Sequence, residues 1–407
     1  MPSVDILSDK PPSAVDGGAQ LVEWLRAQRE RHAVSFSEEF GMYHVFRYAE
    51  VKEVLSDPHT YSSDMITGLI PDEEQKKVGL FFEHHLGKKD PPSHRIMRGL
   101  FNQAFTPRMV AQLEDRVTEM TSGLLDDAGT GEVDLVVKLS YRLPVTIIAE
   151  ILGIPPADEN TFMRWADALL AVTGQEEGFP EDHVPDVADA LSHPLMEIQN
   201  YLIEHCADRR ERPGDDLISR LGQSEMDGHR LSNDEVTALA MNLLVSGYFT
   251  ATMLIGNCLL FLCENPSVQA QLRADPSGLP AHIDEILRLR PSLTRNPRRI
   301  MADTTLGGVD LKAGAPLVVW MAAANRDPLV FDDPDTFNPL RDPNPHLSFG
   351  HGSRFCLGAN LARLEAKVAL EQLFARYRPL TMVPGSARFH DNSDTFGLRS
   401  LTLNLER

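Results

Sequence analysis

The 407-residue sequence has only four cysteines, Cys206, Cys258, Cys263 and Cys356, and no two of them form a CxxC pair. So few thiols in so long a chain exclude a disulfide-stabilised scaffold. Without a cysteine pair, nothing in the spacing supports a cysteine-rich zinc module. A reducing compartment, the cytoplasm, is therefore the expected location.

Positive charge is also scarce, because 39 Lys and Arg residues stand against 59 Asp and Glu residues. The formal net charge of −20 argues against nucleic acid or an anionic membrane surface as the main partner. The first residues also lack the cationic start and apolar core of a signal peptide. We therefore predict a flexible lead-in over residues 1–19 and a globular domain over residues 20–407.

Formal charge is absent altogether between Glu235 and Glu264. This run is long enough to cross a bilayer, but it contains several polar residues. Acidic residues flank it, and the Lys or Arg clusters that accompany spanning helices are missing. We predict a long helix buried in a soluble protein, with no membrane contact.

Helical periodicity dominates the rest of the chain. The predicted helices lie at 20–30, 50–56, 94–104, 107–127, 142–152, 159–173, 185–208, 214–222, 232–264, 266–274 and 279–290, and a last long helix follows residue 356. Strand-like pieces lie at 42–48 and between 297 and 322. No linker divides the chain, so the expected fold is mainly α, a single large domain with small β-sheets.

The most informative segment is FGHGSRFCLG, residues 349–358. A helical pattern follows it, so Cys356 is expected at a helix N-terminus, where free N–H groups stabilise a thiolate. Gly350, Gly352 and Gly358 leave space for a flat ligand, and Arg354 is placed to bind a carboxylate. The residues alone leave three interpretations open: a buried structural cysteine, a zinc ligand together with His346 and His351, or a thiolate ligand to heme iron.

This segment resembles F-G-x-G-x-R-x-C-x-G, the heme-binding loop of the cytochrome P450 family. The resemblance implies a heme b cofactor with Cys356 as the axial iron ligand and with Phe349 and Gly350 in the supporting loop. The segment DPPSHRIMRGLFNQAFTPR resembles the family's helix over the heme edge, and PSLTRNPRRIMADTTLGGVDL resembles its propionate-binding strand. The implied propionate partners are His94, Arg98, Arg298 (with Arg299 as the adjacent alternative) and Arg354.

The resemblance extends to a structural trio. In HIDEILRLRP, Glu285 and Arg288 stand one helical turn apart, and FDDPDTFNPLR supplies Arg341. On a bare helix such a pair is usually a solvated ion pair that contributes little. In the family's order, followed by the cysteine loop, the three are expected to be buried, structural and mutually satisfied.

The long uncharged helix contains LLVSGYFTAT, residues 243–252, which departs from the family pattern. Ser246 and Gly247 match the small pair, and Thr250 matches the catalytic threonine. Phe249 replaces the acid that normally links a proton relay to solvent. Four interpretations of Phe249 stay open. Substrate or trapped water completes the relay with Thr250, or protons arrive by another route while Phe249 shapes an apolar pocket. The other two are a chemistry that depends less on the relay and ordinary core packing.

By resemblance, the substrate pocket is predicted to be mostly apolar, walled by Met65, Phe81, Phe82, Tyr248, Thr252, Leu293, Thr294, Arg295 and Phe396. Arg295 either binds a substrate carboxylate or faces solvent. The expected activity is monooxygenation, most simply hydroxylation, of a mid-sized hydrophobic natural product, with electrons from a separate ferredoxin and ferredoxin reductase. The alternatives are a peroxide-using, desaturating or rearranging heme-thiolate oxidase, and a non-catalytic heme-binding module.

Overall fold

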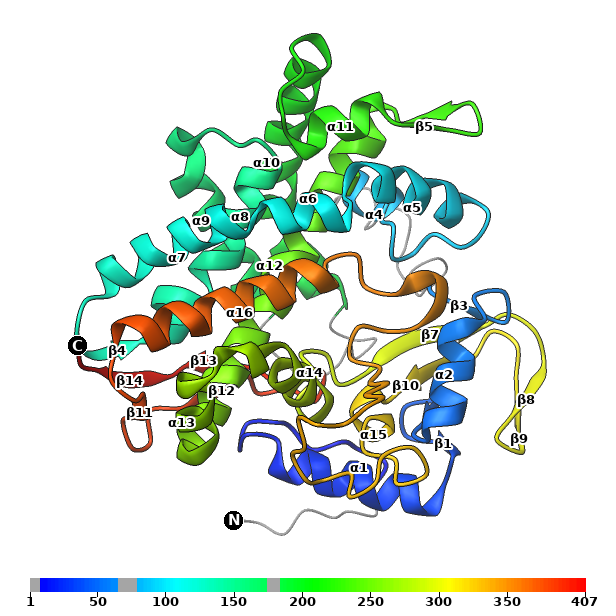
Figure 1. Cartoon of the computed structure of the whole chain (residues 1–407). Coiled ribbons are helices and arrows are strands. Elements are labelled where there is room, and N and C mark those ends of the chain that lie inside the picture. Colours follow the sequence, from blue (N-terminus) through cyan, green and yellow to red (C-terminus); the bar gives the residue numbers. More distant parts are fainter. Residues whose placement is uncertain (1–7, 65–78, 174–183) are drawn as a thin grey trace.

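The computed structural model describes residues 8–64, 79–173 and 184–407. Helices dominate and the strands are short, as predicted (Figure 1). The α-helices are α1 (Ala19–Arg31), α2 (Tyr48–Ser56), α4 (Leu80–Glu83), α5 (Ser93–Ala104), α6 (Pro107–Gln112), α7 (Glu114–Ala128), α8 (Arg142–Ile151), α9 (Glu159–Thr173), α10 (Val184–Glu211), α11 (Leu217–Gln223), α12 (Asn233–Glu264), α13 (Pro266–Ala274), α14 (Leu279–Leu289), α15 (Met321–Ala324) and α16 (Ala359–Arg376).

The largest sheet lies on one side of the molecule and the helices α7 to α10 on the other (Figure 1). Its strand order is β1 (Val34–Ser37), β2 (Met42–Val45), β10 (Pro316–Val319), β7 (Asn296–Ile300) and β3 (Tyr61–Ser62). Only β2 and β10 pair in parallel within it. A three-stranded sheet has the order β11 (Thr381–Met382), β14 (Thr402–Leu405) and β4 (Gly131–Asp134). Three two-stranded sheets pair β12 (Arg388–Phe389) with β13 (Leu398–Ser400), β5 (Glu225–Met226) with β6 (His229–Arg230), and β8 (Thr304–Leu306) with β9 (Val309–Leu311).

The central element is α12, the predicted uncharged helix. A capping box begins it: the Ser232 hydroxyl accepts from the Glu235 N–H, and the Glu235 carboxylate accepts from the Ser232 N–H. In the described part of the chain it is the one helix long and apolar enough to cross a membrane, and 67% of its most apolar window is buried inside the protein. Such burial is typical of a core helix.

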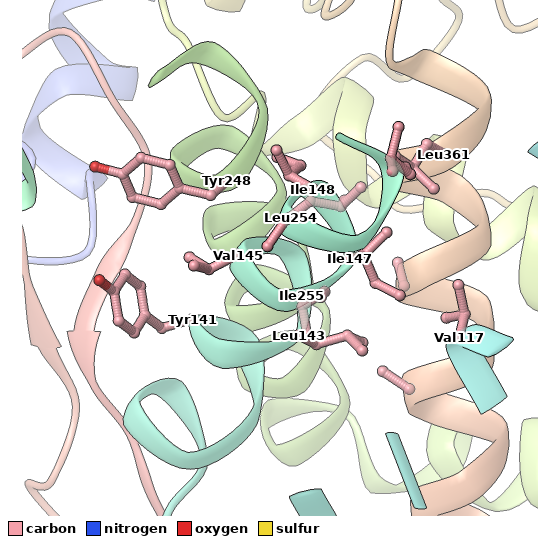
Figure 2. Close-up of a cluster of buried hydrophobic side chains, with 14 of the residues drawn as sticks. Val117, Tyr141, Leu143, Val145, Ile147, Ile148, Tyr248, Leu254, Ile255 and Leu361 are labelled. Carbon is pink, nitrogen blue, oxygen red and sulfur yellow. The ribbon is translucent and has the colours of Figure 1, made fainter. Parts of the chain in front are cut away.

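The core around α12 is formed with α8, α16 and α7 (Figure 2). Val145, Ile147 and Ile148 of α8 pack between Leu254 and Ile255 of α12 on one side and α16 on the other (Figure 2). Side chains at three- and four-residue spacing make this apolar face continuous, so α12 is held over much of its length.

Several local predictions were wrong. The single helix predicted at 107–127 is two helices, because Thr106 caps α6 and the chain turns at Leu113 before α7. The helix predicted at 214–222 begins only at Leu217, where the Asp216 carboxylate accepts from the Ser219 N–H. Residues 1–7 of the predicted lead-in lie outside the described residues. Residues 8–18 pack on the domain: Ala14 is buried and the Trp24 Nε1–H donates to the Ser8 carbonyl over 2.8 Å.

Candidate active site

The loop before α16 holds Cys356 at the helix N-terminus, as predicted. The Cys356 N–H donates to the Phe349 carbonyl over 2.8 Å, which closes the loop. Gly350 and Gly352 have φ of +73° and +68°, a region that side chains disfavour, so both turns need glycine. Gly358 caps α16, and the helix begins at Ala359.

The groups around the Cys356 sulfur have opposing effects on the pKa of its thiol. Burial raises the pKa of the Cys356 thiol, while N–H groups of Gly358 and Ala359 and the charges of Arg98 and Arg363 act to lower it. The Cys356 side chain is nevertheless exposed, so its sulfur has an open side that a ligand can reach. A cation on that open side would stabilise the thiolate that the protein alone does not.

Four basic side chains converge beside this loop from three separate elements. They are His94 and Arg98 on α5, Arg298 on β7 and Arg354 in the loop itself. Burial, followed by the charges of Arg354 and Arg98, lowers the pKa of His94 to about 4. Burial, followed by the charge of Arg354, lowers the pKa of Arg298 to about 10. The groups are thus close enough to repel one another, and Asp90 is the carboxylate that offsets them.

The hydrogen bonds of this cluster are incomplete. The Arg354 guanidinium donates to the Gly87 and Lys89 carbonyls and to Asp90 Oδ1, over 3.0, 2.6 and 2.6 Å. Its Nε is buried and has no partner among the described residues. Arg98 Nη2 donates to the Phe355 carbonyl over 2.6 Å. Arg298 is buried on β7, whereas the adjacent Arg299 is half-buried, which favours Arg298 over its alternative.

These residues fit a heme. The open thiol would bind the iron, and the charges of Arg98, Arg298 and Arg354, which gather around one carboxylate, would receive the two propionates. The zinc interpretation has no support, because no three His, Cys, Asp or Glu side chains gather into a metal-binding group in the part of the chain the structure describes. His346 instead lies 3.8 Å from Asp284, measured from Nε2 to Oδ1.

The middle of α12 has a second open surface. Ser246 is exposed and Thr250 is half-buried, although most of this helix is buried. The Thr250 hydroxyl donates to the Ser246 carbonyl over 3.1 Å, and the Ser292 hydroxyl donates to the Thr250 carbonyl over 2.8 Å. Gly247 faces α8, where an added Cβ would lie 2.5 Å from Ile148 Cδ1, so its lack of a side chain serves helix packing.

Phe249, at the acid position, packs against two aromatic rings. Its ring centroid lies 5.7 Å from that of His390 and 6.5 Å from that of Tyr248, both in edge-to-face geometry. His390 is buried and comes from the C-terminal segment. No sequence pattern pointed to this histidine, because the contact joins residues far apart in the chain.

The predicted trio forms a buried network. Arg288 donates from Nε and Nη2 to the two carboxylate oxygens of Glu285 over 2.8 and 2.7 Å, and both side chains are fully buried. Arg341 Nε donates to Glu285 Oε1 over 3.1 Å. Arg288 Nη1 donates to the Asn325 and Pro334 carbonyls over 2.8 and 2.6 Å. Burial alone would raise the pKa of Glu285, but these donors outweigh it and the pKa is lowered.

The predicted substrate-pocket residues are only partly brought together. Thr294 is buried and its N–H donates to the Asp394 carbonyl over 2.8 Å, while Leu293 bridges to Thr395. Arg295 neither faces solvent nor stands free, because it pairs with Asp394 and lies 5.2 Å from the Trp320 ring centroid. Asp394 was missed, since only the fold places it beside Arg295.

Other members of that set lie in the core. The Tyr248 hydroxyl donates to the Ala166 carbonyl over 3.2 Å, and the Thr252 hydroxyl donates to the Tyr248 carbonyl over 2.8 Å. Phe396 packs in a cluster with Trp24 and Trp320. Phe81 is buried against His85. Met65 and the Phe82 side chain lie outside the described residues.

Comparison with known proteins agrees with this site. The family model described as Cytochrome P450 matches residues 20–277 and 278–406. The chain is 40% identical to an erythromycin C-12 hydroxylase of Saccharopolyspora erythraea, covering 97% of this chain and 96% of that one. It is 38% identical to the cyclomarin C epoxidase of Salinispora arenicola, covering 97% and 98%. The solved open structure of cytochrome P450 EryK from S. erythraea superposes with a TM-score of 0.88 at 38% identity, covering 98% of both chains.

Proposed function

Because this chain belongs to the cytochrome P450 family and is a heme-thiolate oxidoreductase, we propose that it oxidises a mid-sized hydrophobic secondary metabolite, most simply by hydroxylation. Relatives at 35–40% identity are named as hydroxylases, an epoxidase and a monooxygenase of such compounds. The observation that carries the proposal is the Cys356 thiol, open on one side and backed by helix N–H groups beside four basic side chains.

The cofactor of this family is heme b, which when bound supplies the activation of dioxygen and the transfer of one oxygen atom to the substrate. Cys356 would hold the iron through its sulfur, and the N–H groups of Gly358 and Ala359 would stabilise its negative charge. His94, Arg98, Arg298 and Arg354 would hold the propionates. Their number and burial support this assignment, which rests on charge complementarity.

Proton delivery would depend on Thr250. The Thr250 hydroxyl donates its hydrogen bond to the Ser246 carbonyl. Its oxygen is therefore free to accept a hydrogen bond from water or from a substrate hydroxyl. Phe249 can neither donate nor accept, and it is packed against His390 and Tyr248. Substrate or ordered water would therefore complete the relay. The same Phe249 supports the second candidate, a peroxide-using or desaturating oxidase, whose chemistry needs the relay less.

Electrons would come from a separate ferredoxin and its reductase, and the enzyme would act in the cytoplasm. An acidic ferredoxin would dock on the face that bears the cysteine loop, where positive charge is needed against the net charge of −20. Arg95 is suited to this, because its side chain is 65% exposed and its ion pair with Asp227 is open to solvent on both sides, unlike the pairs of Arg354 and Arg363. Arg354 and Arg363 are engaged by Asp90 and Asp284, which makes them weaker candidates.

The function is tested by two linked measurements on the purified holoenzyme. The reduced, carbon monoxide-bound spectrum should show a thiolate ligand, and a spin-shift screen of hydrophobic natural products should find compounds that displace iron-bound water. Turnover of those compounds with ferredoxin and reductase, followed by mass spectrometry, should show addition of one oxygen atom. Product formed only with peroxide, or a product that has lost two hydrogens, would support the second candidate. A thiolate spectrum without turnover under any donor would make the protein a heme-binding module.

A further inference from the structure

A pocket away from the cysteine loop lies where α1 begins and where α12 and α14 end. Its volume is about 450 Å³, within the range of small-molecule sites. Apolar side chains form much of its wall, among them Val22, Leu260, Met382, Phe389 and Phe396. It shares no residue with the cysteine loop or the basic cluster, and Phe396, which the resemblance placed in the substrate pocket, lines this pocket instead. Leu260 lies ten residues beyond Thr250 on α12, which is about 15 Å along the helix.

Two arginines line this pocket, and each is incompletely bonded. Arg290 Nη2 donates to the Gly17 carbonyl over 3.1 Å, and its guanidinium lies 5.9 Å from the Phe396 ring centroid. Arg326 donates to Asp335 Oδ1 over 2.6 Å and to the Leu289 carbonyl over 3.0 Å. The Nε of both arginines is buried without a partner among the described residues. Buried N–H groups left unbonded are costly, so the site has two charged donors to spare.

The two guanidiniums are also close enough to repel each other. Burial lowers the pKa of Arg326 to about 10; Asp335 opposes this shift, and the charges of Arg288 and Arg290 add to it. The acidic residues of the pocket compensate only in part. The Asp16 carboxylate accepts from the N–H groups of Gly18 and Gln20. Burial lowers the pKa of Arg290, and the charge of the exposed Glu264 opposes that shift without cancelling it. An anion between the arginines would relieve both the repulsion and the missing hydrogen bonds.

We propose that this pocket binds an amphipathic carboxylate, a molecule with one carboxylate head and a short hydrocarbon tail. The head pairs with the guanidinium groups of Arg290 and Arg326, which line the pocket, and the tail lies against Phe389, Met382 and Leu260. This is a site separate from the heme and its substrate, and it goes beyond the proposed function.

The test is calorimetric titration of the holoenzyme with octanoate, with the heme site already saturated by an azole. Octanol and octylamine, matched in chain length, are titrated in parallel. Octanoate should bind at one site and more tightly than either analogue. Arg290→Gln and Arg326→Gln should each weaken binding by about tenfold or more, because each removes a charged hydrogen bond. Arg273→Gln is the matched control, since Arg273 also has a buried, unpartnered nitrogen but lies outside the pocket.

A second variant guards against misfolding of the arginine variants. Ala387→Phe places a large side chain in the pocket wall while both arginines are kept, and it should abolish octanoate binding. The melting temperature and the carbon monoxide spectrum of every variant report on the fold. Absence of octanoate binding, tighter binding of octylamine, or unchanged binding to Ala387→Phe would each overturn the proposal. Loss of the thiolate spectrum in the wild-type protein would instead overturn the proposed function, and the titration would still report on this pocket.

Discussion

At the scale of single residues, Cys356 shows how a reactive group is prepared by opposing influences. Burial raises the pKa of its thiol, and the N–H groups of Gly358 and Ala359 act against that rise. The protein therefore provides donors for an anion that it does not fully stabilise. A bound cation is needed to complete the site, which explains why this cysteine has an open side and buried Cys258 does not.

Replacement of this sulfur is the first prediction. Cys356→Ala should purify with little heme, and its reduced, carbon monoxide-bound spectrum should lack the thiolate band, because the thiol that would bind the iron is removed. Absorption spectroscopy and a heme assay measure both effects. Cys263→Ala, at a half-buried cysteine on α12, should keep heme and spectrum. An unchanged spectrum in Cys356→Ala would contradict the assigned ligand.

The second prediction concerns Phe249. Phe249→Glu should destabilise the protein by about 1–3 kcal/mol, because a carboxylate replaces a ring packed against His390 and Tyr248. It should not raise the fraction of consumed electrons that appear in product, since the relay then runs through Thr250 and bound water. Thermal unfolding and the ratio of product to NADPH consumed measure the two effects. Phe249→Leu should keep both close to wild type, and improved coupling in Phe249→Glu would show that a missing acid limits proton delivery.

At the scale of elements, the network of α14 ties distant segments together. Glu285 accepts from Arg288 on its own helix, from Arg341 and from the Asn338 N–H, so one carboxylate joins α14 to the chain that leads into the cysteine loop. A buried ion pair tolerates loss of both partners better than loss of one, because a single remaining charge stays uncompensated. The network therefore positions the loop more than it adds net stability.

The third prediction follows from that burial. Glu285→Gln should lower the free energy of unfolding by about 3–5 kcal/mol, because it leaves Arg288 charged and buried. The pKa of Glu285 is lowered in the folded state, so its contribution is fully present above the unfolded pKa and is lost as the pH falls through the folded value. Urea unfolding across acidic pH should show this loss in the wild type and not in Glu285→Gln.

The exposed pair of Glu225 and Arg230 provides the control for the network. Glu225→Gln should change the free energy of unfolding by less than about 1 kcal/mol, because solvent screens that pair. Similar losses from Glu225→Gln and Glu285→Gln would contradict the proposed role of burial.

Sequence patterns predicted elements where the signal is local. The cap at Ser232 and the uncharged run after it predicted the bounds of α12 to within one residue. The motif around Cys356 predicted the loop and the helix that follows it, α16. The break at Leu113 was missed because apolar periodicity continues across it. Strand β4 was missed because four residues gain strand character only by pairing with β14, far along the chain.

At the scale of the whole molecule, what could not be predicted depends on long-range packing. Sequence identified Gly247 only as one of a small pair, and the close approach of Ile148 from another helix comes from the fold. Arg295 left two possibilities open, and the fold supplied a third, the ion pair with Asp394. The pocket lined by Arg290 and Arg326 is formed by residues at the beginning of α1 and at the ends of α12 and α14, so no local sequence pattern predicts it. Motifs identify chemistry, whereas the neighbours of each residue follow from the complete fold.

The net charge of −20 leads to the last prediction. An acidic redox partner is repelled by the molecule as a whole, so exposed positive charge near the cysteine loop should control its docking. Arg95 lies on α5 between His94 and Arg98, and its pair with Asp227 is exposed on both sides. Arg95→Glu should therefore raise the KM for ferredoxin several-fold and weaken its salt dependence, because rim charges act on association.

Two comparisons isolate docking from chemistry. Peroxide-driven turnover needs no protein partner, so it should be the same in Arg95→Glu and wild type. Arg378→Glu should leave ferredoxin-driven turnover unchanged, because that exposed arginine lies past the far end of α16, about 27 Å from the cysteine loop by helical rise. Equal losses of ferredoxin-driven and peroxide-driven turnover in Arg95→Glu would mean that the substitution disturbs α5 and the basic cluster it carries. Equal effects of Arg95→Glu and Arg378→Glu would mean that only the total charge matters and that the face bearing Cys356 has no special part in docking.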